Sequence, residues 1–108
     1  MKILSMPAGA AKPANLYGHI TNSTVSGYYL ADGTNTYNPV DLGGGTNVLS
    51  VPNALEMLYI GGARWTVTSS YDCTVVITNP STTYNVTAGT PVTIGPVNYP
   101  LDIAITFI

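Results

Sequence analysis

Charged side chains are scarce in this sequence of 108 residues, which has only three basic and five acidic ones. A typical soluble domain is about one quarter charged, so Thr, Asn, Ser, Gly and Tyr must supply most of the surface here. The basic residues Lys2, Lys12 and Arg64 are scattered and form no stripe that would neutralise phosphates, which argues against nucleic acid as a partner. A nearly neutral surface favours self-association and contact with other protein.

Cysteine and histidine occur once each, as Cys73 and His19. A single thiol excludes an internal disulfide and cannot build a zinc site, so Cys73 is expected to be a small buried residue. A catalytic histidine needs a nucleophile and an orienting carboxylate, whereas an exposed or interface histidine needs neither. We therefore expect no enzymatic activity, no cofactor and no metal.

Two polar stretches have some of the features of ligand-binding loops and lack others. Residues 32–41 offer several oxygens but not the bidentate acid and alternate-position ligands of a calcium loop. Residues 43–46, Gly-Gly-Gly-Thr, lack the lysine and the helix of a phosphate-binding loop. Both are expected to be turns. Paired carboxylates for glycoside hydrolysis stay open, although no acidic residue is flanked by a cluster of aromatics.

Long hydrophobic runs are also absent. No stretch approaches the 18 apolar residues of a membrane-spanning helix. The apolar run at the N-terminus is interrupted at Ser5 and Pro7, short of the hydrophobic core of a signal peptide. We therefore expect a protein that has no signal peptide and is not inserted in a membrane.

What the sequence does contain is a series of short runs rich in Val, Ile, Thr and Tyr, interrupted by 11 glycines and eight prolines. Such runs are typical of β-strands. In the clearest one, Leu101, Ile103, Ile105 and Phe107 alternate with Asp102, Ala104 and Thr106, as in a strand with one face on a core. Further strands are predicted at residues 16–21, 25–30, 46–51, 64–69, 73–78, 82–88 and 92–94.

Three further segments are predicted to be a hairpin turn, a strand and a loop. The turn Asn79-Pro80-Ser81 predicts a hairpin between the strands on either side. Residues 55–60 fit either a strand or a helical turn begun at Asn53 with Glu56 in a capping box, and the strand is preferred for the second half. Residues 31–45 are predicted to be a long loop with at most a short strand inside.

The fold expected from this pattern is all-β: a single antiparallel β-sandwich or barrel, jelly-roll-like. Residues 1–14 have no alternation and form a predicted extended N-terminal arm, which leaves 15–108 as the β-sandwich domain. Periodicity does not reveal strand order, so jelly roll and other sandwich topologies stay open.

The aromatic residues suggest where the surface lies. Trp65 and Val67 are two positions apart in a predicted strand and therefore share one of its faces, so we predict that Trp65 is buried. Tyr28 and Tyr29 are adjacent and must point to opposite faces, so at least one of them leaves the core. Tyrosines are common at protein interfaces and on sugar-binding faces. The residues predicted to contact a partner, from the arm and the early strands, are Ile3, Leu4, Met6, Tyr17, His19, Tyr28 and Tyr29.

In overall character, with few charges, an arm at residues 1–14 and a terminal strand at residues 101–108, the chain resembles the small decoration, or cement, proteins of tailed-phage capsids. The resemblance rests on composition and strand spacing. It implies a non-enzymatic virion protein, assembled in the host cytoplasm, that binds between subunits of the major capsid protein, with a homotrimer as the favoured state.

A second interpretation is a glycan- or receptor-binding β-sandwich module of a phage tail or fibre. Such a module would present exposed, coplanar aromatics. The expected burial of Trp65 weighs against it, although the tyrosines keep it open. A small enzyme is a third and weaker alternative, given the single histidine and the sparse acids.

Overall fold

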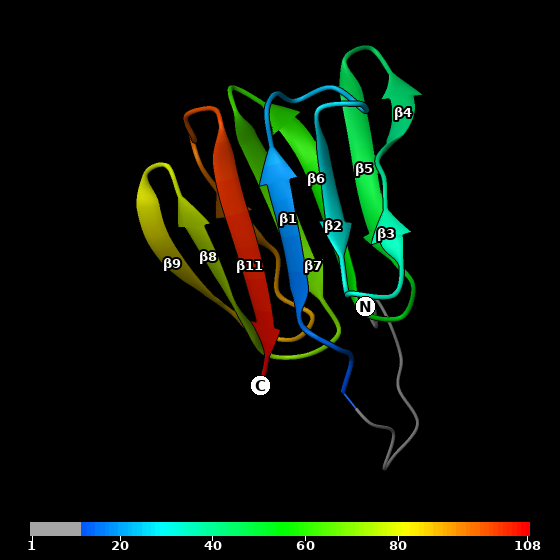
Figure 1. Cartoon of the computed structure of the whole chain (residues 1–108), viewed down its shortest axis with the longest axis vertical. Coiled ribbons are helices and arrows are strands. Elements are labelled where there is room, and N and C mark those ends of the chain that lie inside the picture. The colour runs from blue at the N-terminus through cyan, green and yellow to red at the C-terminus, as the bar shows by residue number, and fades with distance from the viewer. Residues whose placement is uncertain (1–11) are drawn as a thin grey trace.

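The computed structural model describes residues 12–108, and every regular element in this range is a β-strand (Figure 1). The six-stranded sheet has the order β3 (Thr36–Tyr37), β2 (Tyr28–Ala31), β1 (Leu16–Ile20), β11 (Leu101–Phe107), β8 (Cys73–Thr78) and β9 (Ser81–Val86). The five-stranded sheet has the order β10 (Val92–Ile94), β7 (Arg64–Ser69), β6 (Leu55–Gly61), β5 (Thr46–Val51) and β4 (Val40–Gly43). No helix that could span a membrane is found among these residues.

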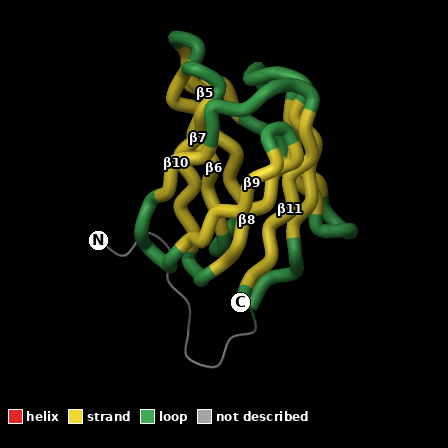
Figure 2. The backbone as a smooth tube through the Cα atoms, turned by 90° about the vertical axis from the view of Figure 1, so that its left-hand side faces the viewer, coloured by secondary structure: helices red, strands yellow, loops and turns green. Residues whose placement is uncertain are grey.

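The two sheets are antiparallel and lie face to face as separate layers (Figure 2). The predicted all-β, two-sheet architecture is confirmed. The barrel alternative is not, because each sheet ends in two edge strands and the sheets do not join into one closed ring.

The core between the layers follows the alternation of the sequence. In β11, the four residues Leu101, Ile103, Ile105 and Phe107 are all buried, as predicted. Trp65 of β7 is fully buried, which is also as predicted. Its indole packs among three tyrosine rings, with centroid distances of 5.4 Å to Tyr28, 5.0 Å to Tyr59 and 6.4 Å to Tyr99.

Several boundaries differ from the predicted ones. Residues 31–45 contain two short strands, β3 and β4, rather than a long loop with at most one, because pairing with β2 and β5 stabilises them. β2 starts at Tyr28 instead of Val25, since residues 21–27 close a turn in which the Thr21 N–H donates to the Gly27 carbonyl. Residues 55–61 form a strand and not a helical turn. The predicted hairpin at residues 79–81 is confirmed by the pairing of β8 with β9.

Most of the predicted arm lies outside the described residues. Residues 12–15, which precede β1, belong to no regular element. β11 lies between β1 and β8, so the first and last strands are neighbours in the middle of the six-stranded sheet (Figure 1). This arrangement brings outward side chains from both ends of the domain onto one surface.

Candidate partner-binding face

The outward side of the six-stranded sheet gathers residues from four strands. We call this surface the outer face. Its members come from β1, β2, β8 and β11: Tyr17, His19, Tyr29, Val76, Thr78, Asp102 and Ala104.

The centre of the outer face is an apolar row across three strands. Tyr17 lies opposite Ala104, and Ala104 lies opposite Val76. The side chains of Tyr17 and Val76 are 59% and 39% exposed, and Tyr29 on the neighbouring strand is 41% exposed. A groove of about 270 Å³ runs beside this row, with Thr78, Asp102 and the backbone of β1 and β11 also lining it. The outer face therefore combines aromatic and aliphatic groups in a shallow hollow, as protein interfaces often do.

A glycine keeps the strands that carry the two tyrosines close together. A Cβ atom on Gly18 would lie 2.1 Å from the backbone oxygen of Tyr29 and 2.9 Å from a methyl group of Leu30. Since the nearest atom belongs to the backbone, a larger residue would push β1 and β2 apart. Gly18 thereby fixes the spacing of Tyr17 and Tyr29 on the outer face.

A side-chain hydrogen bond lies beside the groove, where Asp102 is part of the lining. His19 Nδ1 lies 2.7 Å from Asp102 Oδ1, and the two side chains are 42% and 72% exposed. The Asp102 N–H donates to the Thr78 hydroxyl at 2.9 Å. An exposed pair of this kind contributes at most about 1 kcal/mol, so its stronger effect is to orient His19 and Asp102 at the border of the apolar row.

Tyr28 is the sequence-predicted contact that the structure places elsewhere. Its ring is 3% exposed, and its hydroxyl donates to Asn47 Oδ1 inside the sandwich. Burial raises the pKa of the Tyr28 hydroxyl, and this outweighs the opposite effect of the Trp65 indole. Tyr28 is therefore a core residue, and its neighbour Tyr29 is the one that leaves the core.

Of the other predicted contacts, Tyr17, His19 and Tyr29 lie together on the outer face. His19 is opposite Tyr29 on one side and opposite Asp102 on the other. The predicted arm contacts Ile3, Leu4 and Met6 lie outside the described residues.

The outer face also contains residues that the sequence did not single out, namely Val76, Thr78, Asp102 and Ala104. Alternation in residues 101–107 already placed Asp102 and Ala104 away from the core. Alternation does not reveal that β11 pairs with β1 and β8. This pairing puts Asp102 and Ala104 beside Tyr17 and Val76.

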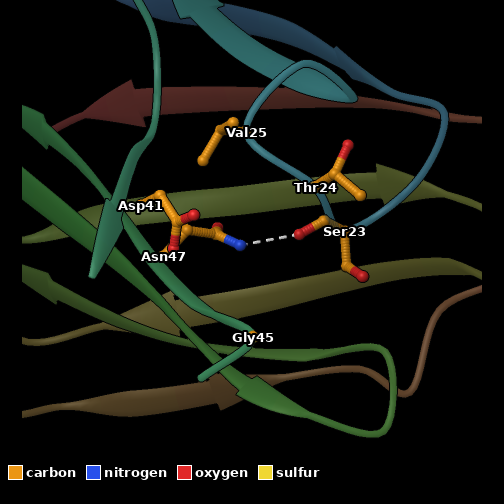
Figure 3. Close-up of a pocket in the computed structure, with 6 residues that line it drawn as sticks. All are labelled: Ser23, Thr24, Val25, Asp41, Gly45 and Asn47. Carbon is orange, nitrogen blue, oxygen red and sulfur yellow. Dashed lines mark hydrogen bonds between the residues drawn. The ribbon is translucent and has the colours of Figure 1, made fainter. Parts of the chain in front are cut away.

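A second hollow lies at the end of the sandwich, between the turn after β1 and the β4–β5 hairpin. It encloses about 270 Å³ and is lined by Ser23, Thr24, Val25, Asp41, Gly45 and Asn47. Figure 3 shows the Asn47 amide directed at the Ser23 carbonyl, to which it donates at 2.7 Å. Asp41 accepts the Gly43 N–H at 2.8 Å. These groups hold the turn and the hairpin in place, so we do not assign a ligand to this hollow.

The single thiol of the chain, that of Cys73, lies on β8. Cys73 is buried, and burial raises the pKa of its thiol, which disfavours the reactive thiolate. No group of three or more His, Cys, Asp or Glu side chains in this part of the chain is placed to hold a metal ion.

The outer side of the five-stranded sheet has an apolar row of a different kind. Val40, which is 61% exposed, lies opposite Val48, and Val48 lies opposite Leu58. This row has no tyrosine, and the charged residues Glu56 and Arg64 lie on β6, the strand of Leu58, and on the next strand, β7. It provides matched aliphatic positions for comparison with the outer face.

Comparisons of this chain with protein-family models, with curated proteins and with solved structures found no match.

Proposed function

We propose that this protein is a non-enzymatic structural protein that binds protein subunits through the outer face. In its specific form, the proposal is a decoration protein that stabilises a tailed-phage capsid by binding between subunits of the major capsid protein as a homotrimer. The trimer and the capsid come from the resemblance described above. The arm residues Ile3, Leu4 and Met6 are proposed as further contacts.

The observation that carries this proposal is the composition of the outer face. Tyr17, Ala104 and Val76 form a continuous apolar row in which Tyr17 and Val76 are exposed, and the hydrogen-bonded His19 and Asp102 lie at its border. Apolar and aromatic groups at the centre with polar groups around them are the usual arrangement of a protein interface. A surface with so few charges also offers little repulsion to a neighbouring subunit.

A jelly-roll-like topology is part of the same proposal. β11 follows β10 of the other sheet and returns to lie between β1 and β8, which supports a Greek-key relation. β4 to β7 form a simple meander, so the likeness is one of architecture more than of strand order.

The glycan- or receptor-binding module remains the second candidate because two exposed tyrosines, Tyr17 and Tyr29, share one face. Tyrosine rings stack on sugars as well as on protein. The burial of Trp65 removes the largest ring from such a site. The apolar Val76 and Ala104 beside Tyr17 fit a protein partner better than a sugar, which needs hydrogen-bonding groups.

The test is co-sedimentation of the full-length chain with purified tailed-phage shells that lack their own decoration protein. We expect saturable binding to such shells, and we expect Val76→Asp to reduce it about tenfold or more by placing an unpaired charge in the apolar row. Val40→Asp is the matched control on the other sheet and should bind as the native chain does.

Two results would contradict the proposal. One is a failure of the native chain to bind any of the tailed-phage shells tested. The other is equal binding by Val76→Asp and Val40→Asp. Binding to a glycan array that Tyr17→Ala and Tyr29→Ala abolish would favour the second candidate instead.

A further inference from the structure

The four edge strands of the sandwich differ in how well they are protected against pairing with another chain. Natural sheets protect their edges with short strands, charges, prolines or bulges. β3 has two residues, and β10 has three and lies between Pro91 and Pro96. β4 has four residues, a bulge between Asp41 and Gly43, and the charge of Asp41.

β9 lacks most of these protections, although Pro80 directly precedes it. It has six residues, Ser-Thr-Thr-Tyr-Asn-Val, with no charge and no proline. Its pairing with β8 is regular from Ser81 to Val86, without a bulge. Within residues 12–108, β8 is its only strand partner, and no backbone hydrogen bond from another segment reaches it. In Figure 1 no further strand lies beyond β9 at that side of the sheet.

β9 is also held firmly in place. The Tyr84 hydroxyl accepts the Gly95 N–H at 3.1 Å, which ties the inward side of the strand to the segment that follows β10. Just before β9, the Asn79 carbonyl accepts the Asn98 N–H at 2.8 Å. Just after it, Asp72 Oδ1 accepts the Ala88 N–H at 2.9 Å. A strand fixed in this way loses little conformational freedom when it binds, which favours association.

From this edge we infer that two copies of the chain associate by antiparallel pairing of β9 with β9, which joins their six-stranded sheets into one. The free edge of a strand presents backbone N–H and C=O groups, and the group that satisfies them best is another strand. A second copy fits because the edge is uncharged, so two identical edges meet without repulsion.

The symmetry of this pairing restricts its register. Residues directly opposite each other on antiparallel strands point to the same face. A two-fold axis through the pair must therefore set one residue opposite its own copy, and this residue is Thr83 or Tyr84 when most of the strand is paired. In either register, the two Thr83 side chains lie directly or diagonally opposite, within about 8 Å.

The inference uses the backbone edge of β9 and not the side chains around Tyr17, although Thr83 of β9 lies opposite Val76 of the outer face. Six paired residues make a small interface, so we expect a dissociation constant in roughly the micromolar range rather than the nanomolar range. If a trimer also forms through other contacts, each of its three subunits would present one β9 edge to another trimer.

The test measures the mass of the full-length chain by light scattering over a range of concentrations. We expect the native chain to associate in pairs and Thr83→Lys to weaken this about tenfold or more, because each pair would bring two lysines together. Thr83 is exposed, so the variant should fold normally. Thr93→Lys, an exposed threonine on the edge strand β10, is the matched control and should leave the mass unchanged.

Amide hydrogen exchange locates the contact in the same samples. We expect alternate amides of β9 to become protected as the concentration rises, while those of β10 do not change. A native chain that never forms even-numbered species, equal association of Thr83→Lys and the native chain, or unprotected β9 amides in the associated state would each overturn the inference. A loss of shell binding by Val76→Asp with the mass unchanged would leave it standing.

Discussion

The two faces of the six-stranded sheet are built from the same strands, yet they carry different kinds of side chain. On β8, Val75 is fully buried, whereas the next residue, Val76, is 39% exposed. On β2, Tyr28 is 3% exposed and Tyr29 is 41% exposed. Adjacent residues of one type therefore serve opposite purposes, because successive side chains of a strand point to opposite faces.

This difference separates stability from binding. Side chains on the inner face stabilise the fold by burying apolar surface within the chain. Side chains on the outer face leave apolar surface in water. They do not stabilise the isolated domain, but they stabilise a complex whose partner covers them. Substitutions on the inner face should therefore lower the free energy of unfolding, and substitutions on the outer face should change association.

The largest effect is expected at Trp65, which lies opposite the inner face and fills the space between the sheets. Trp65→Ala should lower the free energy of unfolding by about 3–5 kcal/mol, because it removes a fully buried indole and leaves a cavity. Urea unfolding followed by circular dichroism measures this loss. A loss below about 1 kcal/mol would mean that the indole does not support the core.

The adjacent valines give the sharpest comparison. Val75→Thr should cost about 1–3 kcal/mol, since it buries a hydroxyl in an apolar site. Val76→Thr should change stability by no more than about 0.5 kcal/mol, as expected for an exposed position. Both values come from the same urea titrations. Equal costs at the two positions would contradict the assignment of the two faces.

The adjacent tyrosines repeat this comparison with a smaller effect. Tyr28→Phe removes the donor to Asn47 Oδ1 and leaves that buried acceptor unpaired, at a cost of about 1–2 kcal/mol. Tyr29→Phe should be neutral for folding. If thermal unfolding shifts by the same amount in both variants, the Tyr28–Asn47 hydrogen bond does not contribute.

The smallest effect is expected from pH. Burial raises the pKa of the Cys73 thiol and of the Tyr28 hydroxyl, so both groups ionise at lower pH in the unfolded chain than in the folded one. The unfolded chain then binds fewer protons, and stability should fall as the pH rises past about 8.5 for the thiol and about 10 for the phenol. Urea midpoints measured from neutral to alkaline pH test this, and a midpoint that rises with pH would contradict it.

Much of the core was predictable because burial follows alternation. The pattern in residues 101–107 determined which side chains of β11 are buried, and the same reasoning placed Trp65 inside. Alternation also required Tyr28 and Tyr29 to separate. It did not indicate which of them points inward, because that depends on which side of β2 the other sheet covers.

The short strands β3 and β4 could not be predicted from their own residues. Thr36 and Tyr37 gain strand geometry only by pairing with β2, a contact that no local pattern encodes. The arrangement of residues on the outer face could not be predicted for the same reason. Tyr17, Val76 and Ala104 become neighbours through the pairing of β11 with β1 and β8, which joins distant parts of the sequence.

The central claim is that the outer face binds protein, and the measurement that tests it most directly is co-sedimentation of Val76→Asp and Val40→Asp with undecorated phage shells. The proposal predicts that Val76→Asp loses binding while Val40→Asp retains it, with both variants folded by circular dichroism. Retained binding by folded Val76→Asp would show that the outer face is not the contact surface.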